Sequence, residues 1–549
     1  MEFFINNMPP IMFLTLICFL LLGFPVAFSL AANGILYTLL GIYFGVFPFA
    51  FLQALPERVF GIVQNDSLLA VPFFTLMGLI LERSGMAEDL LETIGQLFGP
   101  IRGGLAIAVV LVGAMLAATT GVISASVISM GLISLPIMLR YGYDRRLATG
   151  VIAAAGTLSQ IIPPSIVLII LADQVGRSIG DMYRGAMLPG LMLTGAYVLY
   201  VVLMATFKPS SAPAIPEKDR IYREDNGASG LKSLILLSAI GAVAAYYALP
   251  HLVRNQSAID EHIVVAMLVW GVVVFVAALI NKVLHLNLLS KICERVVFVM
   301  IPPLFLIFLV LGTIFIGVAT PTEGGAMGSV GAILLAFARK RLSLDLLKQA
   351  MDTTTKLTSF VIFILVGSTI FTLTFTGFGG QHWVAGLFSS LPGGEIGFLL
   401  LVSVATFLLA FFLDFFELAF IIVPLLAPVA ESMGIDLIWF GVLLAVNMQT
   451  SFMHPPFGFA LFFLRSVAPK DDYIDKVTGQ KVRHVSTGDI YRGSIPFIII
   501  QLLMVILVLT FPGVVTHYKQ GHTMVDPNTI HIEAPAVESE TSEEPPAFF

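Results

Sequence analysis

The chain has 549 residues, of which 57% are hydrophobic and only 12% are charged, and its mean hydropathy is +0.95. Soluble globular domains carry about 25% charged residues, so this composition excludes an ordinary soluble protein and indicates a polytopic membrane protein. The net charge of −6 says little, because the positions of Lys and Arg orient a membrane protein and their sum does not. Two cysteines make a disulfide framework or a thiolate metal site improbable.

The apolar segments predict about twelve membrane spans, since a bilayer core of about 30 Å needs about 20 apolar residues per helix. The first segment has no basic residue before it, so we expect an uncleaved span and not a secretory signal. The predicted spans lie near residues 9–28, 30–50, 67–82, 147–172, 186–206, 231–250, 262–281, 296–318, 322–338, 357–376, 438–465 and 491–512.

Two further apolar stretches, 103–140 and 395–430, are predicted to be re-entrant hairpins. Each has polar residues at its middle, ATTGVISAS in the first and LDFFE in the second. Arginines flank the first hairpin, whereas no Lys or Arg lies between Lys356 and Arg465, a stretch that contains the second. Because cytoplasmic loops are enriched in Lys and Arg, we expect the hairpins to open to opposite sides of the membrane. Both chain termini are then expected in the periplasm.

An internal repeat with an offset of 292 residues runs through the chain. The pair Pro163-Pro164 in SQIIPPS recurs as Pro455-Pro456 in TSFMHPPFG. Because the two hairpins open to opposite sides, we expect an inverted repeat, as in many secondary transporters. Five other positions recur as the same residue type at this offset: Pro136, Gly142, Asp144, Ala153 and Ser159.

The sequence therefore predicts an all-α polytopic membrane protein, an inverted-repeat carrier with about twelve spanning helices and two opposed re-entrant hairpins. Residues 1–206 form the expected first repeat and residues 293–512 the second. Residues 207–292 are expected to hold a charged linker and a two-span insert. The acidic tail, 513–549, is rich in Glu, Pro, Ser and Thr and is expected to be disordered.

Each Pro-Pro pair is predicted to interrupt a spanning helix, because proline removes a backbone donor and disfavours helix at the residue before it. In lipid, such a break is tolerated only where it is buried in protein or lines a cavity. The freed carbonyls suit a cation and the half-helix N-termini suit an anion. The alternative is an ordinary proline kink without a ligand. The site residues expected beside the breaks are Thr157, Ser159, Gln160, Pro163, Asn447, Gln449, Thr450, Ser451 and Pro455.

The hairpin tips are predicted to supply the second half of the site. A carboxylate within an apolar segment costs about 2.5–3.5 kcal/mol on insertion scales, so it is usually paired or functional. Asp414 is the sharper candidate, as a Na⁺ ligand or a proton carrier. The alternatives are a solvated turn for the acids and bonds back to the helix backbone for the hydroxyls. The expected tip residues are Thr119, Thr120, Gly121, Ser124 and Ser126 in the first hairpin, and Asp414 and Glu417 in the second.

Sodium is the favoured coupling ion, because carbonyl, hydroxyl and carboxylate oxygens suit a hard cation. Proton coupling through Asp414 and His454 stays open, and a packed histidine without such a role is the alternative for His454. The sequence has no Walker A pattern, dinucleotide-binding glycine fingerprint, HExxH or Cys/His cluster. We therefore expect transport driven by an ion gradient, with no catalytic residues and no organic cofactor.

Four segments stand out beside the repeat: GLISLPIMLRYGYDRRLATGVIAAAGTLSQIIPPSIVL, ATPTEGGA, FFLDFFELAFIIVPLLAP and NMQTSFMHPPFGFALFFL. They resemble the large membrane subunit of tripartite ATP-independent periplasmic (TRAP) transporters, the DctM-like permeases. The family's usual first tip reads Ser-Gly-Ser-Ser, whereas here Thr120-Gly121 is followed by Val122-Ile123, so no side-chain ligand is carried over at those two positions. The TTGVISAS tip and the long insert resemble the mannitol/chloroaromatic subgroup.

The resemblance implies a sodium-coupled importer of organic acids, including 2-oxo or hydroxy acids, in a bacterial inner membrane. It also implies an elevator motion of the hairpin domain against a scaffold that includes residues 9–50 and 296–338. Two partners are implied: a small four-helix membrane subunit of the Q type and a periplasmic substrate-binding protein of the P type. The rival hypothesis is a stand-alone Na⁺- or H⁺-coupled dicarboxylate or anion carrier without a binding protein. A membrane-embedded enzyme is disfavoured, because His382, His454, Asp414 and Glu417 do not make a catalytic set.

Overall fold

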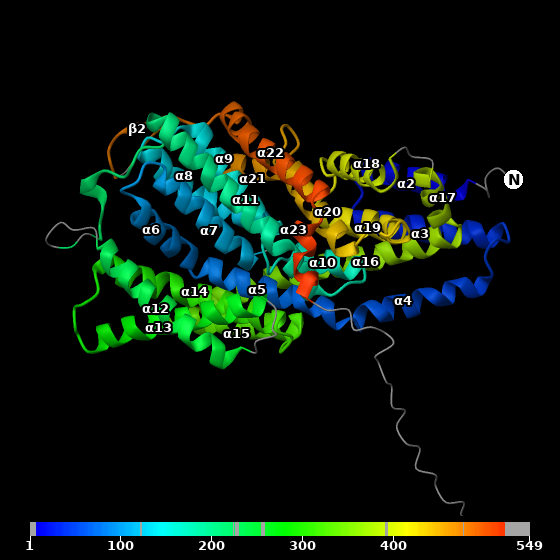
Figure 1. Cartoon of the computed structure of the whole chain (residues 1–549). Helices are drawn as coiled ribbons and strands as arrows, with labels where there is room; N and C mark the ends of the chain where they lie inside the picture. The colour runs from blue at the N-terminus through cyan, green and yellow to red at the C-terminus, as the bar shows by residue number, and fades with distance from the viewer. Residues whose placement is uncertain are drawn as a thin grey trace, which may run out of the picture.

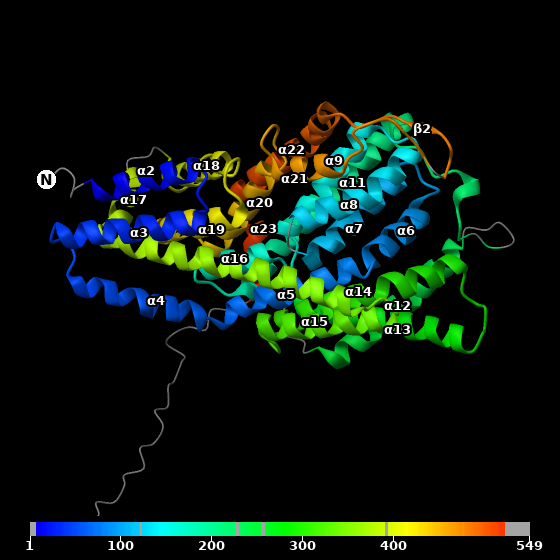
Figure 2. The same cartoon turned by 180° about the vertical axis from the view of Figure 1, so that it is seen from behind.

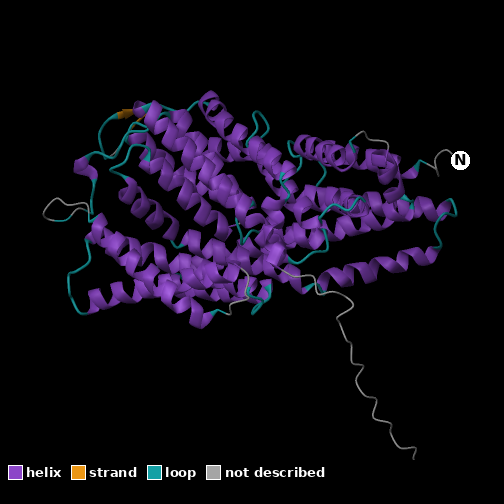
Figure 3. Cartoon of the chain, viewed as in Figure 1, coloured by secondary structure: helices purple, strands orange, loops and turns teal. Residues whose placement is uncertain are grey.

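The computed structural model describes residues 7–120, 123–222, 224, 230–253, 259–389, 393–475 and 477–521. Within these residues the chain is almost entirely helical, and the only sheet is a two-stranded antiparallel hairpin (Figure 3). Nine of the described helices are long and apolar enough to span a membrane, or ten if the bent pair α4 and α5 counts as one span. This confirms the predicted all-α polytopic membrane fold.

The helices fall into two successive series separated by a helical pair. The first series is α2 (Met8–Leu21), α3 (Val26–Tyr43), η1 (Phe49–Gln53), α4 (Ala54–Val63), η2 (Asp66–Leu69), α5 (Ala70–Arg83), α6 (Met86–Phe98), α7 (Gly104–Thr120), α8 (Ile123–Arg140), α9 (Arg145–Thr157), η3 (Leu158–Gln160), α10 (Ile166–Gln174) and α11 (Ile179–Phe207). After the short turns η4 (Pro209–Ser211) and η5 (Glu217–Asp219) come the pair α12 (Leu231–Leu252) and α13 (Ile259–Val283). The second series is α14 (Lys291–Phe315), α15 (Pro321–Ala338), α16 (Leu344–Gly377), α17 (Gly380–Ser389), α18 (Gly394–Leu409), α19 (Phe415–Ser432), α20 (Leu437–Ser451), α21 (Phe459–Val467), β1 (Tyr473–Ile474), β2 (Lys481–Val482), α22 (Thr487–Thr510), α23 (Gly513–Thr516) and η6 (His517–Gly521).

The helix boundaries explain why fewer uninterrupted spans are present than the twelve predicted. The Pro-Pro pairs split the segment at 147–172 into α9 and α10, and the segment at 438–465 into α20 and α21. The segment at 9–28 forms α2, which has only 14 residues. The predicted hairpins coincide with the pairs α7–α8 and α18–α19. Their re-entrant path through a bilayer and the total of twelve crossings stay predictions.

The repeat offset of 292 reappears in the helix boundaries. Helix α8 spans 123–140 and α19 spans 415–432, so both ends are shifted by 292. Beyond the second break the offset grows to 308, because SIGDMYRG at Ser178–Gly185 matches STGDIYRG at Ser486–Gly493. Both serines are N-caps that accept a hydrogen bond from the aspartate amide three residues later. The segment that contains the β-hairpin accounts for the 16 additional residues.

Contacts between helices follow the same repeat. Helix α3 packs on α16 and its counterpart α15 packs on α5, while α2 contacts α17 and α14 contacts α6. Helix α8 contacts α21 and, in the other half, α19 contacts α10. The first two helices of each series therefore lie against the opposite series (Figures 1 and 2). Each of these contacts that a helix of the first series makes with the second series therefore has a repeat-related counterpart in the opposite direction.

Helices α9 and α20 lie in the interior and lead into the two breaks. Every residue of α9 from Leu147 to Thr157 is buried, and so is every residue of α20. Helix α22 approaches α9 so closely that a Cβ added to Gly150 would lie 2.1 Å from the Gly493 carbonyl oxygen. Because no side chain fits between these backbones, glycine is required at this crossing.

The C-terminal boundary differs from the prediction, because the tail expected to be disordered from residue 513 begins with ordered turns. Helix α23 and η6 pack against α11, and Val515 is fully buried. Lys519 forms an ion pair with Asp436, the N-cap of α20. The predicted boundary at 513 is therefore too early, and residues 522–549 lie outside the described residues.

Arginine ion pairs gather around the β-hairpin. Arg140 pairs with Asp475 at 3.1 Å, and Arg145 and Arg146 lie 3.9 and 3.7 Å from the Asp489 carboxylate. Figures 1 and 2 show β2 at the end of the molecule opposite the N-terminus. The side of the membrane on which each end lies stays a prediction.

Candidate functional site

Both predicted helix breaks are present in the structure. The chain leaves helical geometry after η3 and resumes it in α10 at Ile166, and it leaves α20 at Ser451 and resumes in α21 at Phe459. The Pro163-Pro164 and Pro455-Pro456 bonds lie within these breaks, and both are cis. The proline pairs therefore end one half-helix and precede the start of the next, as expected.

A cavity of about 220 Å³ lies where the hairpin tips meet the two breaks. Its wall combines residues that are far apart in the sequence, from both hairpins and both broken helices. A small solute in this cavity would contact all four elements at once. The lining residues are Ile123, Ser124, Gln160, Val167, Asp414, Phe415, Phe416, Phe452, Phe459 and Phe463.

Four helices of the described chain begin at this cavity. Ile123, Phe415 and Phe459 are the first residues of α8, α19 and α21, and Val167 is the second residue of α10. The first amides of a helix lack intrahelical acceptors, and the helix dipole adds a partial positive charge there. Four such ends around one cavity form an environment that favours an anion.

Asp414 lies at the cavity wall as the N-cap of α19. Its Oδ1 accepts a hydrogen bond from the Glu417 amide at 2.9 Å, and the Glu417 carboxylate accepts one from the Asp414 amide at 2.9 Å. This reciprocal capping box fixes the start of α19. Asp414 lines the cavity and Glu417 does not. The two predicted acids therefore take different positions, although they share one cap.

Gln160 and Ser124 are the neutral polar groups of the cavity wall. Gln160 is 1% exposed, and neither atom of its amide has a hydrogen-bond partner within the described residues. The Ser124 hydroxyl also has no such partner in the described part of the chain. Because buried polar groups are nearly always hydrogen-bonded, an unpartnered amide at a cavity wall marks a position for solute, ion or water.

Thr157 and Gln449 meet in a buried polar cluster just before the two breaks. The Gln449 amide donates to the Thr157 hydroxyl at 3.3 Å, and Gln501 of α22 donates to the same oxygen at 3.4 Å. The Thr157 hydroxyl in turn donates to the Ala154 carbonyl at 2.9 Å. Sequence reasoning missed Gln501, although a single amide within the apolar stretch IIIQLLMV is a signal for it.

Four further residues predicted beside the breaks donate hydrogen bonds to backbone carbonyls. Ser159 donates to the Gly156 carbonyl at 3.0 Å and Thr450 to the Val446 carbonyl at 3.0 Å. Ser451 donates to the Asn447 carbonyl at 3.4 Å, and Asn447 donates to the Ser403 carbonyl of α18 at 2.7 Å. Of these four bonds, the one from Asn447 joins α20 to α18, whereas each of the other three stays within one broken helix.

Three predicted positions at the first tip fall outside what the structure describes. Gly121 is outside the described residues, and so are the side chains of Thr119 and Thr120 at the end of α7. Ser126 is buried in α8 and is not among the residues that line the cavity. Of the predicted first-tip residues, Ser124 is therefore the one that the structure places at the cavity.

Aromatic residues form much of the cavity wall, and sequence reasoning missed them. Phe415 and Phe416 follow Asp414 directly, while Phe459 and Phe463 lie one turn apart at the start of α21. Phe452 packs against Phe459 with ring centroids 5.7 Å apart. The pairs of Phe in FFLDFFE and FGFALFF are a signal, but the chain has 44 Phe and most of them have other roles.

His454 lies beside the second break within an aromatic group. Its ring centroid is 5.5 Å from that of Phe407 and 5.3 Å from that of Phe411. It is not one of the residues that line the cavity. His454 is therefore packed, as the alternative expects, but its buried Nδ1 has no hydrogen-bond partner within the described residues. Its proposed role in proton coupling stays a prediction.

Comparison with known proteins gives a consistent result over nearly the whole chain. The family model described as "Tripartite ATP-independent periplasmic transporter, DctM component" matches residues 13–514. The C4-dicarboxylate TRAP transporter large permease protein DctM of Pseudomonas aeruginosa is 28% identical over 464 residues, covering 84% of this chain and 88% of that protein. The Vibrio cholerae protein of the same description is 25% identical over 528 residues, covering 92% of this chain and 96% of that protein.

A solved structure shares the fold. The YdaH transporter of Alcanivorax borkumensis superposes with a TM-score of 0.50 at 15% sequence identity. The superposition covers 84% of this chain and 89% of that chain.

Proposed function

The chain belongs to the DctM component family of tripartite ATP-independent periplasmic transporters, and we propose that it imports an organic acid with Na⁺ as the coupling ion. It is the large permease subunit of a secondary transporter and a multi-pass membrane protein of a bacterium, and it is not an enzyme. These assignments confirm the family resemblance and the transport function inferred from the sequence. The mannitol/chloroaromatic subgroup stays a prediction.

The convergence of four helix N-termini on one cavity is the observation that carries the proposed substrate class. A carboxylate placed there accepts hydrogen bonds from first-turn amides and lies at the positive ends of the dipoles. The cavity, at about 220 Å³, is smaller than the roughly 300–1,000 Å³ typical of pockets for drug-sized ligands, so it suits a small solute. The two relatives named for C4-dicarboxylates support a carboxylate, and 2-oxo and hydroxy acids have the same head group.

Asp414 is the only charged side chain among the described residues that line this cavity. Its negative charge disfavours a second carboxylate nearby, so we assign it to the coupling ion and not to the solute. The chain at the breaks supplies carbonyl oxygens, and these together with a carboxylate suit Na⁺. Gln160 and Ser124, whose polar atoms have no partner in the described chain, are assigned to the solute.

The moving unit in this proposal consists of the hairpins and the broken helices, and the long helices α3, α5, α15 and α16 belong to the scaffold. The repeat-related contacts of α3 with α16 and of α15 with α5 support such a frame. A small Q-type membrane subunit and a periplasmic P-type binding protein are the proposed partners. We place both chain termini in the periplasm, in keeping with the ion-paired arginine loops at the opposite end from the N-terminus.

The rival is a stand-alone Na⁺- or H⁺-coupled carrier that needs no binding protein. The complex is purified with its Q-type subunit, reconstituted into liposomes, and given an inward Na⁺ gradient with the binding protein added outside. Uptake of a carboxylate that requires the gradient and the binding protein supports the proposal. Uptake without the binding protein supports the rival, and uptake that follows a proton gradient alone overturns sodium coupling.

A further inference from the structure

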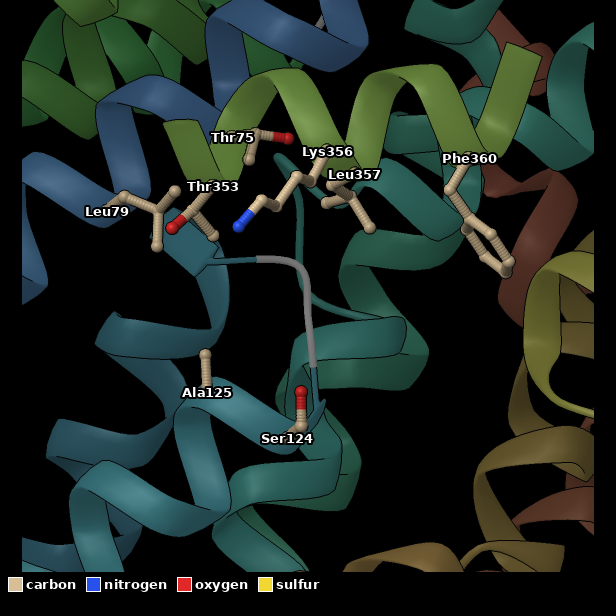
Figure 4. A pocket seen from close by; sticks show the side chains of 8 residues that line it. All are labelled: Thr75, Leu79, Ser124, Ala125, Thr353, Lys356, Leu357 and Phe360. Carbon is tan, nitrogen blue, oxygen red and sulfur yellow. The ribbon is translucent and has the colours of Figure 1, made fainter. Parts of the chain in front are cut away.

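A second cavity of about 370 Å³ lies between the scaffold and the tip of the first hairpin. Thr75 and Leu79 come from α5, and Ser124 and Ala125 come from α8. The remaining wall is a continuous face of α16. Figure 4 shows these side chains around the space between α16 and α8, with the Lys356 amino group extending into it. The α16 residues are Thr353, Lys356, Leu357 and Phe360.

The two cavities are neighbours. Ser124 lines both of them, so the start of α8 is a shared wall. Phe360 of α16 lines the second cavity and packs edge-on against Phe416, which lines the first, with ring centroids 6.0 Å apart. The two cavities therefore adjoin each other at the start of α8 and at the Phe360-Phe416 contact.

Lys356 is the only charged side chain among the described residues that line the second cavity. It is an exposed residue at the mouth of this open cavity, and no described residue is its counter-ion. It makes no hydrogen bond or ion pair with any described residue, including Asp352 one turn earlier on the same helix. The other polar groups behave differently, since Thr75 donates to the Val71 carbonyl at 2.7 Å and Thr353 donates to the Gln349 carbonyl at 2.9 Å. Only the Lys356 ammonium and the Ser124 hydroxyl are left without partners at this described wall.

We propose that Lys356 binds the carboxylate of the transported solute where the solute lies between the first hairpin tip and α16. This inference rests on the proposed function and identifies a cationic side chain for the carboxylate of the solute. The first cavity has helix N-termini but no cationic side chain among its described lining residues, and Asp414 adds a negative charge. Lys356 supplies the positive charge from the adjoining wall, and Ser124 donates a hydrogen bond to the same carboxylate.

The position of Lys356 also assigns it a stage in transport. It stands on the scaffold, whereas Ser124 stands on the hairpin, so the pair can hold one carboxylate only while these two elements face each other. Lys356 thereby favours entry into or exit from the first cavity on one side of the membrane. A lysine suits this role, because its compact charge on a flexible stem can follow a moving ligand.

The first experiment measures anion attraction without knowledge of the solute. In full-length protein with Cys18→Ser and Cys293→Ala, a Ser124→Cys thiol reacts with a sulfonate-bearing and with a neutral methanethiosulfonate reagent of similar size. We expect Lys356→Gln to lower the rate with the anionic reagent relative to the neutral one by about three- to tenfold, since a local charge raises the concentration of counter-ions. Lys356→Arg should keep the wild-type ratio of the rates with the anionic and the neutral reagent. Lys348→Gln, on the same helix but away from the cavity, is the control and should also keep it.

An unchanged ratio of the two rates in Lys356→Gln overturns the proposal. An equal loss in Lys348→Gln also overturns it, because the effect would then come from general surface charge. A phospholipid phosphate offers the same chemistry as a carboxylate, so the measurement is repeated in phosphatidylcholine alone and with added phosphatidylglycerol. An effect of Lys356 that appears only with the anionic lipid assigns the lysine to lipid and overturns the proposal.

The second experiment uses the reconstituted complex and the carboxylates that the wild-type protein transports. Lys356→Gln should raise the half-saturating concentration about tenfold, the factor expected for loss of one charge-assisted hydrogen bond. Lys356→Arg, which keeps the positive charge, should have a half-saturating concentration close to the wild-type value. If wild-type protein transports carboxylates and Lys356→Gln does so equally well, this inference fails and the proposed function stands. If wild-type protein transports none while the thiol experiment shows the Lys356 effect, the proposed function fails and an anion site at Lys356 stands.

Discussion

The Gln449 side-chain amide donates a hydrogen bond to the hydroxyl of Thr157, and the two residues are separated by 292 positions, the offset of the internal repeat. Two residues that are related by a repeat and also touch each other lie close to the axis that relates the two halves. The breaks follow directly after these residues in both halves. This contact therefore brings the two interrupted helices together.

Thr157→Val should destabilise the protein, because it strands the amides of Gln449 and Gln501 in a buried environment without their acceptor. Each unsatisfied donor costs about 1–3 kcal/mol. Thr450→Val is the matched control, since among the described residues the Thr450 hydroxyl bonds only to a carbonyl of its own helix. Thermal unfolding of the purified protein in detergent measures both variants. Equal unfolding temperatures for the two would contradict this account of the Thr157 cluster.

A double variant tests the same contact more directly. Gln449→Leu removes one of the amides that Thr157→Val leaves without an acceptor. The combined destabilisation should therefore be smaller than the sum of the two single effects by about 0.5 kcal/mol or more, as found for residues in direct contact. Strict additivity would show that the hydrogen bond does not couple the halves.

Two substitutions of Asp414 separate the effect of its charge on transport from the effect of its N-cap on stability. Asp414→Asn keeps a good N-cap and removes the charge, so Na⁺-driven uptake should be lost while the unfolding temperature stays near that of wild type. Asp414→Ala should lose uptake and also about 0.5–2 kcal/mol of stability, because the cap is lost as well. Asp144→Asn, at the N-cap of α9 and away from the cavity, is the control and should keep uptake. Full sodium-dependent uptake by Asp414→Asn would remove the carboxylate from the mechanism.

Gln160→Met should have opposite effects on stability and transport. The Gln160 amide is buried without partners in the described structure, so replacing it with an apolar group of similar shape removes a desolvation cost of about 1–3 kcal/mol. The unfolding temperature should rise or stay the same, while the half-saturating solute concentration rises about tenfold. Gln501→Met removes an amide that is hydrogen-bonded, and its unfolding temperature should fall. A Gln160→Met protein with unchanged transport would exclude this amide from solute binding.

Local sequence signals located many of the apolar helices and both interruptions, but not α6 and α17, which lie outside the predicted segments. Apolar length predicts where α8 and α19 lie, and proline chemistry predicts where α9 and α20 end, because both signals depend only on neighbouring residues. The β-hairpin after α21 was not predicted, since two strands of two residues give almost no periodic signal. The shift of the offset from 292 to 308 follows from this insertion.

The direction of a side chain was much harder to predict than its position along the chain. Ser159 and Gln160 are adjacent in one turn, yet the short serine reaches only its own helix carbonyl and the longer glutamine reaches the cavity. Lys356 is distant in sequence from both breaks and comes to the hairpin tip only because α16 packs beside α5. Such relationships depend on tertiary packing, which a residue pattern in one segment does not contain.

The contact between Arg140 and Asp475 predicts how the β-hairpin is held. The arginine Nε lies 3.1 Å from both carboxylate oxygens of Asp475, and the Asp475 side chain is only 6% exposed. Arg140→Gln leaves this carboxylate with its bonds to Thr478 but without a counter-charge. Amide hydrogen exchange over residues 473–482 should become about tenfold faster or more, which corresponds to about 1.4 kcal/mol.

A second substitution and a control define what this result means. Asp475→Asn in the Arg140→Gln background removes the stranded charge and keeps an acceptor for Thr478, so exchange should return toward the wild-type rate. Arg102→Gln removes an exposed arginine with no described partner and should leave the hairpin protected. Solute uptake should persist in all three proteins, because the hairpin does not line the cavity. Unchanged exchange in Arg140→Gln would show that Arg465, which donates to the Val485 carbonyl, and the flanking turns hold this segment without the ion pair.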